Sequence, residues 1–227
     1  MDLQTHYNRL WEKSRAGFEA GSFKLDPWID NPADDRLGIT LLARPSREVK
    51  ERIRAFLGEL QQVAPEQYFY PDTDLHITVL SIISCTSGFT LGSVNAADYV
   101  QLLESITRHA SPFKVEFNGI TASPEAVMIQ GFPLDNSLQM LRESIRAAFS
   151  ATSLLQSLDQ RYTLKTAHAT VLRFRAPVQQ PEQLLSLLEK YRTYDFGTFE
   201  VEVLELVYND WYQREEKVQV LGRFGLS

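Results

Sequence analysis

The apolar positions of the chain fall into short segments of helical or strand spacing. Near the start they recur every three or four residues, which predicts an amphipathic helix carrying Leu3, Tyr7, Leu10, Trp11 and Phe18. The segment from Gly21 to Asp35 is rich in Asp, Pro and Asn, so we expect a loop there. Residues 1–35 thus form a helix and a loop that precede the rest of the pattern.

Two successive stretches of the chain then follow a similar order of strands and helices. In the first, strands are expected at Arg36–Leu42, Gln67–Tyr70, Leu75–Ile83, Phe113–Phe117 and Ala126–Phe132. Helices are expected at Val49–Leu60, with Ser46 as the N-cap, and at Ala96–His109. In the second, helices are expected at Leu138–Phe149 and Pro181–Tyr191, and strands at His168–Phe174, Phe199–Val203 and Val218–Phe224. The small, polar stretch Ser84–Asn95 is expected to be an exposed loop.

The two stretches also match in sequence. Each carries a His-x-Thr-Val-Leu segment, at His76 and at His168, and 168 − 76 gives an offset of 92 residues. Each later carries an alternating strand, Phe-Lys-Val-Glu-Phe from Phe113 and Phe-Glu-Val-Glu-Val from Phe199. The offset is too long for a solenoid unit, which usually repeats at ~20–50 residues. We therefore predict a duplicated α+β lobe, with two pseudo-symmetric copies facing each other inside one domain over residues 1–227.

Composition and charge narrow the class of partner. Of the 227 residues, 44% are hydrophobic and 23% are charged, which is ordinary for a soluble globular protein. The formal net charge of −6 argues against broad binding to a nucleic-acid backbone, which needs many Lys and Arg contacts. A nucleotide or the end of a short RNA suits this balance better.

The cysteine count, the length of the apolar runs and the heptad pattern bear on the compartment and the oligomeric state. Cys85 is the single cysteine, which rules out an internal disulfide and suits a reducing compartment. No apolar run approaches the ~20 residues that cross a bilayer. We expect a soluble cytoplasmic protein without membrane contact. The sequence has no coiled-coil heptads, and a monomer is favoured.

The repeated motif is the strongest chemical signal. Side chains alternate along a strand, so His76 and Thr78 share one face and Ile77 and Val79 the other. The same holds for His168 and Thr170. One such motif is most often a structural histidine. Two in matching places, in a chain with only four histidines, favour a shared function. A structural histidine copied by duplication is the alternative.

Two imidazoles suit the cleavage of a phosphodiester. One can deprotonate the attacking oxygen and the other can protonate the leaving oxygen, because histidine titrates near neutral pH. Each threonine hydroxyl can donate to a non-bridging phosphoryl oxygen. This scheme needs neither a metal nor a cofactor. A zinc site wants three or four ligands, and each segment supplies one histidine and a threonine, a poor ligand set.

The doubled His-x-Thr-Val motif, at His76–Val79 and at His168–Val171, resembles that of the 2H phosphoesterase superfamily, which includes 2′–5′ RNA ligase-like proteins and cyclic-nucleotide phosphodiesterases. The resemblance covers residues 36–224. It implies a bilobal α+β fold with a groove between two antiparallel sheets. His76 and His168 would line the groove as catalytic residues, and Thr78 and Thr170 would bind phosphate there.

Many members of that superfamily carry an arginine three residues after the second threonine, and Arg173 occupies this position. The resemblance makes it a phosphate clamp. Strict alternation, however, places Arg173 on the face away from His168, and it reaches a phosphate only if the strand bulges or ends there. A solvated arginine at the end of a strand is the alternative.

Several other residues have two interpretations. Tyr68, Phe69 and Tyr70 are suited to stack on bases or to pack a strand. Trp211 and Tyr212, in an expected turn over residues 209–216, suit either a ligand cover or an anchor to the core. The Ser84–Asn95 loop is either a lid or a plain connection, and Cys85 is expected to be a small buried or loop thiol.

The sequence thus favours a metal-independent phosphodiesterase acting on 2′,3′-cyclic phosphates or 2′–5′ linkages of nucleotides or RNA ends. Two alternatives remain open at this point, an RNA 2′–5′ ligase and a non-catalytic nucleotide or RNA-end binding protein. Which histidine is the acid and which is the base also remains open, because the roles reverse with the direction of the reaction.

Overall fold

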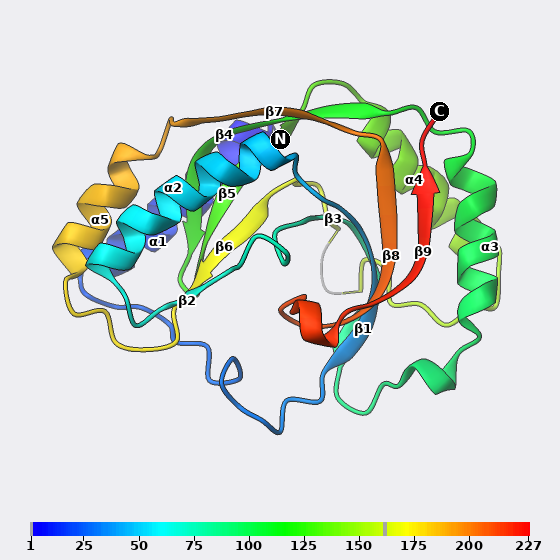
Figure 1. Cartoon of the computed structure of the whole chain (residues 1–227), viewed down its shortest axis with the longest axis horizontal. Helices are drawn as coiled ribbons and strands as arrows, with labels where there is room; N and C mark the ends of the chain where they lie inside the picture. The colour runs from blue at the N-terminus through cyan, green and yellow to red at the C-terminus, as the bar shows by residue number, and fades with distance from the viewer. Residues whose placement is uncertain (1, 161–162) are drawn as a thin grey trace.

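The computed structural model describes residues 2–160 and 163–227 and has an α+β fold built on two antiparallel sheets (Figure 1). The helices of this part of the chain are α1 (Leu3–Glu19), α2 (Arg47–Val63), α3 (Ala96–Thr107), α4 (Ser137–Ser150) and α5 (Pro181–Lys190), with single 3₁₀ turns at Leu91–Ser93 and Glu215–Lys217. The side chains of Asp2 and Ser46 cap α1 and α2, the latter as the sequence predicts.

The strands divide into two sheets. The first has the order β3-β1-β8-β9 and the second the order β2-β6-β5-β4-β7. Their bounds are β1 (Leu37–Ala43), β2 (Tyr68–Phe69), β3 (Ile77–Thr86), β4 (Phe113–Ser123), β5 (Ala126–Pro133), β6 (Ala169–Arg173), β7 (Asp195–Val201), β8 (Val203–Asp210) and β9 (Gln219–Gly225). The two histidine motifs therefore lie on different sheets, the first at the start of β3 and the second at the start of β6.

Each sheet takes strands from both halves of the chain. The strand of the first motif, β3, shares its sheet with β8 and β9 from the C-terminal end. The strand of the second motif, β6, shares its sheet with β4 and β5, which precede it. The duplicated order of elements thus folds into two sheets that exchange strand pairs.

The strand predicted across Phe199–Val203 is partly wrong: Phe199 and Val201 lie in a strand, but the chain changes sheets before Val203. β7 ends at Val201 and β8 begins at Val203. Phe199 and Val201 are buried, whereas Val203 is exposed and Leu204 is buried. The alternation therefore shifts by one residue at this corner. The strand that follows, β8, was missed by the sequence pattern and lies inside the first sheet.

The exposed loop predicted at Ser84–Asn95 is partly wrong. β3 continues to Thr86, and Leu91–Ser93 forms a single helical turn. Gly38 explains why β3 extends so far, because a Cβ there would overlap backbone atoms of Ile83 and Cys85 on the paired strand. This close approach lets β1 and β3 pair up to Leu37 and Thr86.

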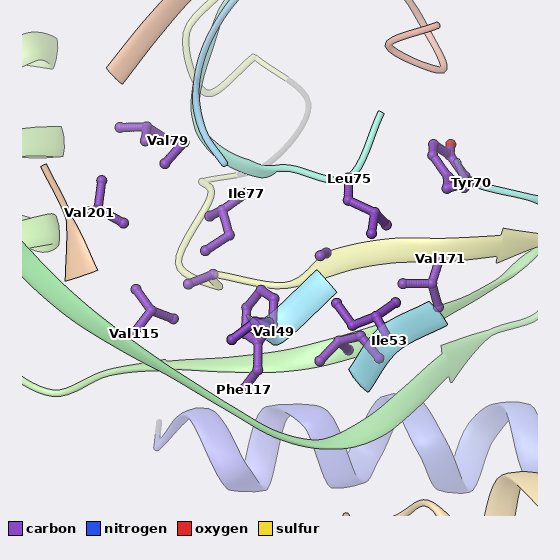
Figure 2. Close-up of a cluster of buried hydrophobic side chains, with 14 of the residues drawn as sticks. Val49, Ile53, Tyr70, Leu75, Ile77, Val79, Val115, Phe117, Val171 and Val201 are labelled. Carbon is purple, nitrogen blue, oxygen red and sulfur yellow. The ribbon is translucent and has the colours of Figure 1, made fainter. Parts of the chain in front are cut away.

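The helices pack on the outer sides of the sheets and close one hydrophobic core. Helix α1 packs against β4, α2 against β7 and α5 beside both helices, while α3 and α4 pack near β9 and β3 (Figure 1). The apolar sides of both motif strands enter the same core. Figure 2 shows this cluster with Ile77, Val79, Val171, Val115 and Phe117 among its members.

None of the helices within residues 2–160 and 163–227 is both long enough and apolar enough to cross a membrane.

Two glycine-to-alanine changes should alter stability in opposite directions. A Cβ at Gly131 would overlap the carbonyl oxygen of Ala167, the residue before His168. Overpacking of this kind typically costs ~1–3 kcal/mol. Gly58 lies within α2 and has no atom near a Cβ, so alanine there should gain ~0.5–1 kcal/mol of helix stability. Urea unfolding measures both, and a Gly131→Ala protein as stable as the native one would contradict the close approach.

Candidate active site

Each motif strand carries a β-bulge one residue after its threonine. Thr78 pairs with Leu42 and Leu80 with Leu41, which leaves Val79 without a partner on β1. In the second sheet Thr170 pairs with Met128 and Leu172 with Val127, which leaves Val171 without a partner on β5. The two copies of the motif therefore share a local irregularity as well as a sequence. Such an insertion shifts the alternation of the residues after it.

The bulges explain how Arg173 joins the histidine face. With strict alternation it would lie opposite Thr170, but one extra residue between them restores it to the same side. Arg173 and the residue at the matching place in the first motif, Ser81, both line one cavity with the motif side chains. The structure thus resolves the conflict in the sequence pattern. Arg173 is the last residue of β6, but its side chain is only 13% exposed, so it is not the solvated arginine of the alternative.

All five residues singled out in the sequence line this single cavity between the two sheets: His76, Thr78, His168, Thr170 and Arg173. The residues between them point the other way, and Ile77, Val79, Ala169 and Val171 are at most 1% exposed. Burial of these apolar side chains fixes each strand in one orientation. It therefore determines that the imidazoles and hydroxyls face the cavity.

The cavity has further walls that the motif does not predict. They come from β1, from the residue after β2, from β3 beyond its bulge, from the segment after α4 and from the end of β8 with its following turn: Thr40, Tyr70, Leu80, Ser81, Ser84, Cys85, Ser157, Asp159, Leu164, Asn209, Trp211 and Gln213. Among the described non-glycine residues, Asp159 and Gln213 have positive φ, and both line this cavity. Such backbone conformations cluster at functional sites.

His76 is held by the backbone two residues before it. Its Nδ1 lies 2.7 Å from the carbonyl oxygen of Asp74. A carbonyl only accepts hydrogen bonds, so Nδ1 carries the proton in this contact. The neutral imidazole therefore has its lone pair on Nε2, which is the form that a general base requires.

His168 is held differently. Its Nδ1 lies 2.8 Å from Oγ1 of Thr166, two residues earlier on the same face of the chain. A hydroxyl both donates and accepts, so this contact permits a proton on either ring nitrogen of the neutral imidazole. The two copies of the motif are consequently alike in sequence and unlike in the hydrogen bond that orients each ring.

Both imidazoles are neutral at pH 7. Burial lowers the pKa of His76 to about 4, with smaller contributions from the positive charges of Arg44 and Arg173 and from His168. Burial also lowers the pKa of His168 to about 4, with Arg142, His6 and Arg173 adding to the effect. A bound anion would act in the opposite direction, because negative charge near an imidazole favours its protonated form.

Arg173 is fixed in place by three neighbours. Its Nε donates to the hydroxyl of Tyr70 at 2.9 Å, and its Nη1 lies 3.5 Å from the carboxylate of Asp26. Its guanidinium carbon lies 5.4 Å from the ring centre of Tyr212. Asp26 and Tyr212 also bond each other at 2.9 Å. The loop before β1 therefore positions the cationic side chain at the cavity.

The aromatic residues considered in the sequence divide between the cavity and the core. Tyr70 and Trp211 line the cavity, and Trp211 also packs against the guanidinium of Arg36 at 5.1 Å. Tyr212 is fully buried and bonds Asp26, so it anchors its turn to the core. Cys85 is a buried thiol at the cavity wall, as expected for a small buried residue.

Arg142 on α4 is the residue near the site that sequence reasoning missed. It is 1% exposed and donates to three backbone carbonyls: Val79 (2.9 Å), Thr78 (3.0 Å) and Thr166 (2.7 Å). The sequence carries one sign of it. Leu138 lies four residues before it and Ile145 three residues after, so Arg142 falls on the apolar face of its helix.

Within residues 2–160 and 163–227, no three side chains among His, Cys, Asp and Glu come close enough together to hold a metal ion.

Two repeated imidazole–hydroxyl pairs facing one cavity, on two antiparallel sheets, define a two-histidine architecture. A family model described as the 2′-5′ RNA ligase superfamily matches residues 45–211, well over half of the chain. The chain therefore belongs to this superfamily of 2H phosphoesterases, as the doubled motif predicts.

Solved structures with low sequence identity share the fold. TT0787 of Thermus thermophilus has 19% identity and a TM-score of 0.59, covering 83% of this chain and 97% of its own. LigT of E. coli complexed with 3′-AMP has 14% identity and a TM-score of 0.58, covering 85% and 99%. ATU0111 of Agrobacterium tumefaciens str. C58, a conserved protein of unknown function, has 14% identity and a TM-score of 0.60, covering 92% and 99%. None of the curated proteins matches the chain.

The two cavity histidines should weaken the fold in acid, because their pKa values are lowered in the folded chain. Between pH 6.5 and 4 the unfolded chain binds protons at His76 and His168 that the folded chain does not, so stability falls as pH decreases through this window. In a protein carrying both His76→Ala and His168→Ala, unfolding free energy should depend less on pH there. Urea unfolding from pH 7 to pH 4 measures this, with the exposed His109→Ala protein as the control. Identical slopes in all three proteins would contradict the lowered pKa values of the pair.

Proposed function

We propose that the chain is a metal-independent phosphodiesterase that hydrolyses 2′,3′-cyclic phosphates or 2′–5′ linkages of nucleotides or RNA ends. The observation that carries this proposal is the convergence of two imidazole–hydroxyl pairs, from two sheets, on one cavity beside a guanidinium. A phosphate between the sheets would have an imidazole on each side. That arrangement suits in-line displacement, in which the attacking and leaving oxygens lie on opposite sides of phosphorus.

The proposed reaction divides the proton transfers between the two histidines. One neutral imidazole takes a proton from water as the water oxygen bonds to phosphorus. The bond from phosphorus to one ribose oxygen breaks, and the protonated second imidazole gives its proton to that oxygen. The hydrogen bond to the Asp74 carbonyl leaves the Nε2 lone pair of neutral His76 available as the base. We therefore assign the base to His76 and the acid to His168 in the hydrolysis of a cyclic phosphate.

The remaining polar groups would stabilise the charge on phosphorus. Thr78 and Thr170 would donate their hydroxyl protons to non-bridging oxygens, and Arg173 would add a positive charge already held by Tyr70 and Asp26. The anion itself would raise the low pKa of the imidazoles, so that one of them takes up a proton when substrate binds. Substrate binding would thus create the acid that the reaction needs.

Nucleotide substrates are supported by related folds. E. coli LigT has been solved in complexes with 3′-AMP, ATP and NADP+. The cavity of the present chain adds Trp211 and the amide side chains of Asn209 and Gln213 to the phosphate-binding groups. Flat aromatic and amide groups of this kind suit a nucleobase. The same residues would serve ligation, since joining ends through a 2′–5′ bond is the reverse of its cleavage.

Loss of either histidine should abolish most turnover while preserving the fold. Single His76→Ala and His168→Ala proteins should each lose ~10²–10⁴-fold in kcat on nucleoside 2′,3′-cyclic monophosphates, the usual range for a positioned acid or base. The assay runs in excess chelator, and the released isomer shows which oxygen leaves. His109→Ala, an exposed change two residues past α3, is the matched control. Full activity in either cavity variant would overturn the proposal, whereas binding of 3′-AMP without turnover would favour the binding-protein alternative.

The rate should also peak in acid. The form with one protonated and one neutral imidazole is most abundant near the two pKa values of about 4, below the ordinary value of 6.5. Since kcat/KM reports the groups of the free enzyme, we expect it to peak below pH 6.5 and to fall at higher pH as the acid loses its proton. A maximum above pH 7 would be incompatible with this pair as acid and base.

A further inference from the structure

Arg142 is a buried cation that bonds to the backbone near both motifs, yet it does not line the cavity. Its three bonds reach two separate parts of the site. Nε and Nη2 donate to Val79 and Thr78 on β3, and Nη2 also donates to Thr166, just before His168. Among the described residues it forms no ion pair. Burial lowers its pKa to about 10, so it remains charged at neutral pH.

The bonds to β3 satisfy groups that the bulge leaves open. β3 is an edge strand of its sheet, so no neighbouring strand lies on its outer side to donate hydrogen bonds to the Thr78 and Val79 carbonyls. In the second sheet the matching carbonyl, that of Val171, accepts from the backbone of Tyr70 at 3.0 Å. The Arg142 guanidinium therefore supplies, at the first motif, the hydrogen-bond donor that the backbone after β2 supplies at the second.

The bond to Thr166 links Arg142 to His168 through a single residue. Arg142 holds the carbonyl of Thr166, and the hydroxyl of the same residue lies 2.8 Å from Nδ1 of His168. One side chain thus holds the backbone of the first motif and the residue that orients the second histidine. A planar guanidinium has five donors in a fixed fork, whereas an ammonium group is a point charge on a flexible stem.

We propose that Arg142 is a positioning residue that sets the separation and orientation of the two catalytic motifs. The proposal rests on the function proposed above, in which both histidines act on one phosphodiester. Arg142 acts through Thr78 and Thr166 and has no contact with substrate. Its effect therefore falls on the rate of the chemical step, since a displacement of about 1 Å can cost ~10²-fold in rate.

Kinetics with nucleoside 2′,3′-cyclic monophosphates test the proposal. Arg142→Met should lower kcat by about a hundredfold and change KM by less than about threefold, because no substrate contact is lost. Arg142→Lys should not restore kcat, since it keeps the charge and loses the fork. Arg108→Met, which removes an exposed arginine at the end of α3, should match the native protein. Native kcat in Arg142→Met or in Arg142→Lys would overturn the proposal.

A folding defect is separated from mispositioning by chemical rescue. In Arg142→Ala, guanidinium chloride at ~50 mM should recover part of kcat, and sodium chloride at the same concentration should not, because the free ion can refill the fork-shaped site. If Arg142→Met does not fold, Arg142→Lys and this rescue decide between the outcomes. Equal response to both salts would count against the proposal.

An NMR measurement does not depend on turnover, so it tests the positioning role of Arg142 even if no phosphodiester is cleaved. The charged or titratable groups that act on His168 are Arg142 from α4, His6 from α1, Arg173 from β6 and His76 from the facing sheet. In Arg142→Met the ¹⁵N signals of His168 should show a changed tautomer balance and a pKa moved upward toward 6.5. Arg142→Lys should change the tautomer balance with a smaller pKa change. Unchanged His168 signals in Arg142→Met would overturn the positioning role, whatever the fate of the phosphodiesterase proposal.

Discussion

The site depends on a one-residue break in strand pairing that occurs after each motif threonine. Without the extra valine, the residues of each strand would alternate strictly, and a side chain three positions past the threonine would point into the core. With it, the imidazole, the hydroxyl and that third side chain all face one cavity, while the valine itself packs in the apolar cluster. Each copy of the motif is therefore accompanied by the same backbone geometry as well as by two chemical groups. A strand that paired without interruption would present only the imidazole and the hydroxyl.

The second constraint is the exchange of strands between the sheets. The chain passes from β7 in one sheet to β8 in the other across a single residue, Glu202. The sheet that carries His76 is completed by the last strands of the chain, so neither motif belongs to a lobe that could fold from one half alone. The two walls of the cavity are thus linked covalently at the β7–β8 corner and by hydrogen bonds through the guanidinium on α4. A change in the distance between the walls would have to strain both links.

Local patterns in the sequence predict much of this structure. Helical and strand periodicity and capping signals predict five helices and most strands. The paired motif predicts four of the residues that line the cavity, and the family resemblance adds Arg173. The rest depends on contacts between distant segments. The sheet change near Val203 follows from where β7 and β8 find partners, and alternation alone continues smoothly through Phe199 and Val201.

The bulge at Val171 follows from pairing with β5, which no short window of sequence contains. Arg142 is visible in the sequence as a charged residue on an apolar helix face. Its partners are backbone carbonyls, which every residue has, so the sequence does not reveal them.

The two ring nitrogens that anchor the histidines meet unlike groups, a carbonyl at His76 and a hydroxyl at His168. A symmetric duplication would give a cavity whose two ends are interchangeable. Here a carbonyl commits one ring to a single tautomer and a hydroxyl leaves the other free to exchange between two. A phosphodiester lying between them meets a different partner at each bridging oxygen. The cavity consequently has a polarity, because its two ends present histidines with different hydrogen-bonding behaviour to any group that lies between them.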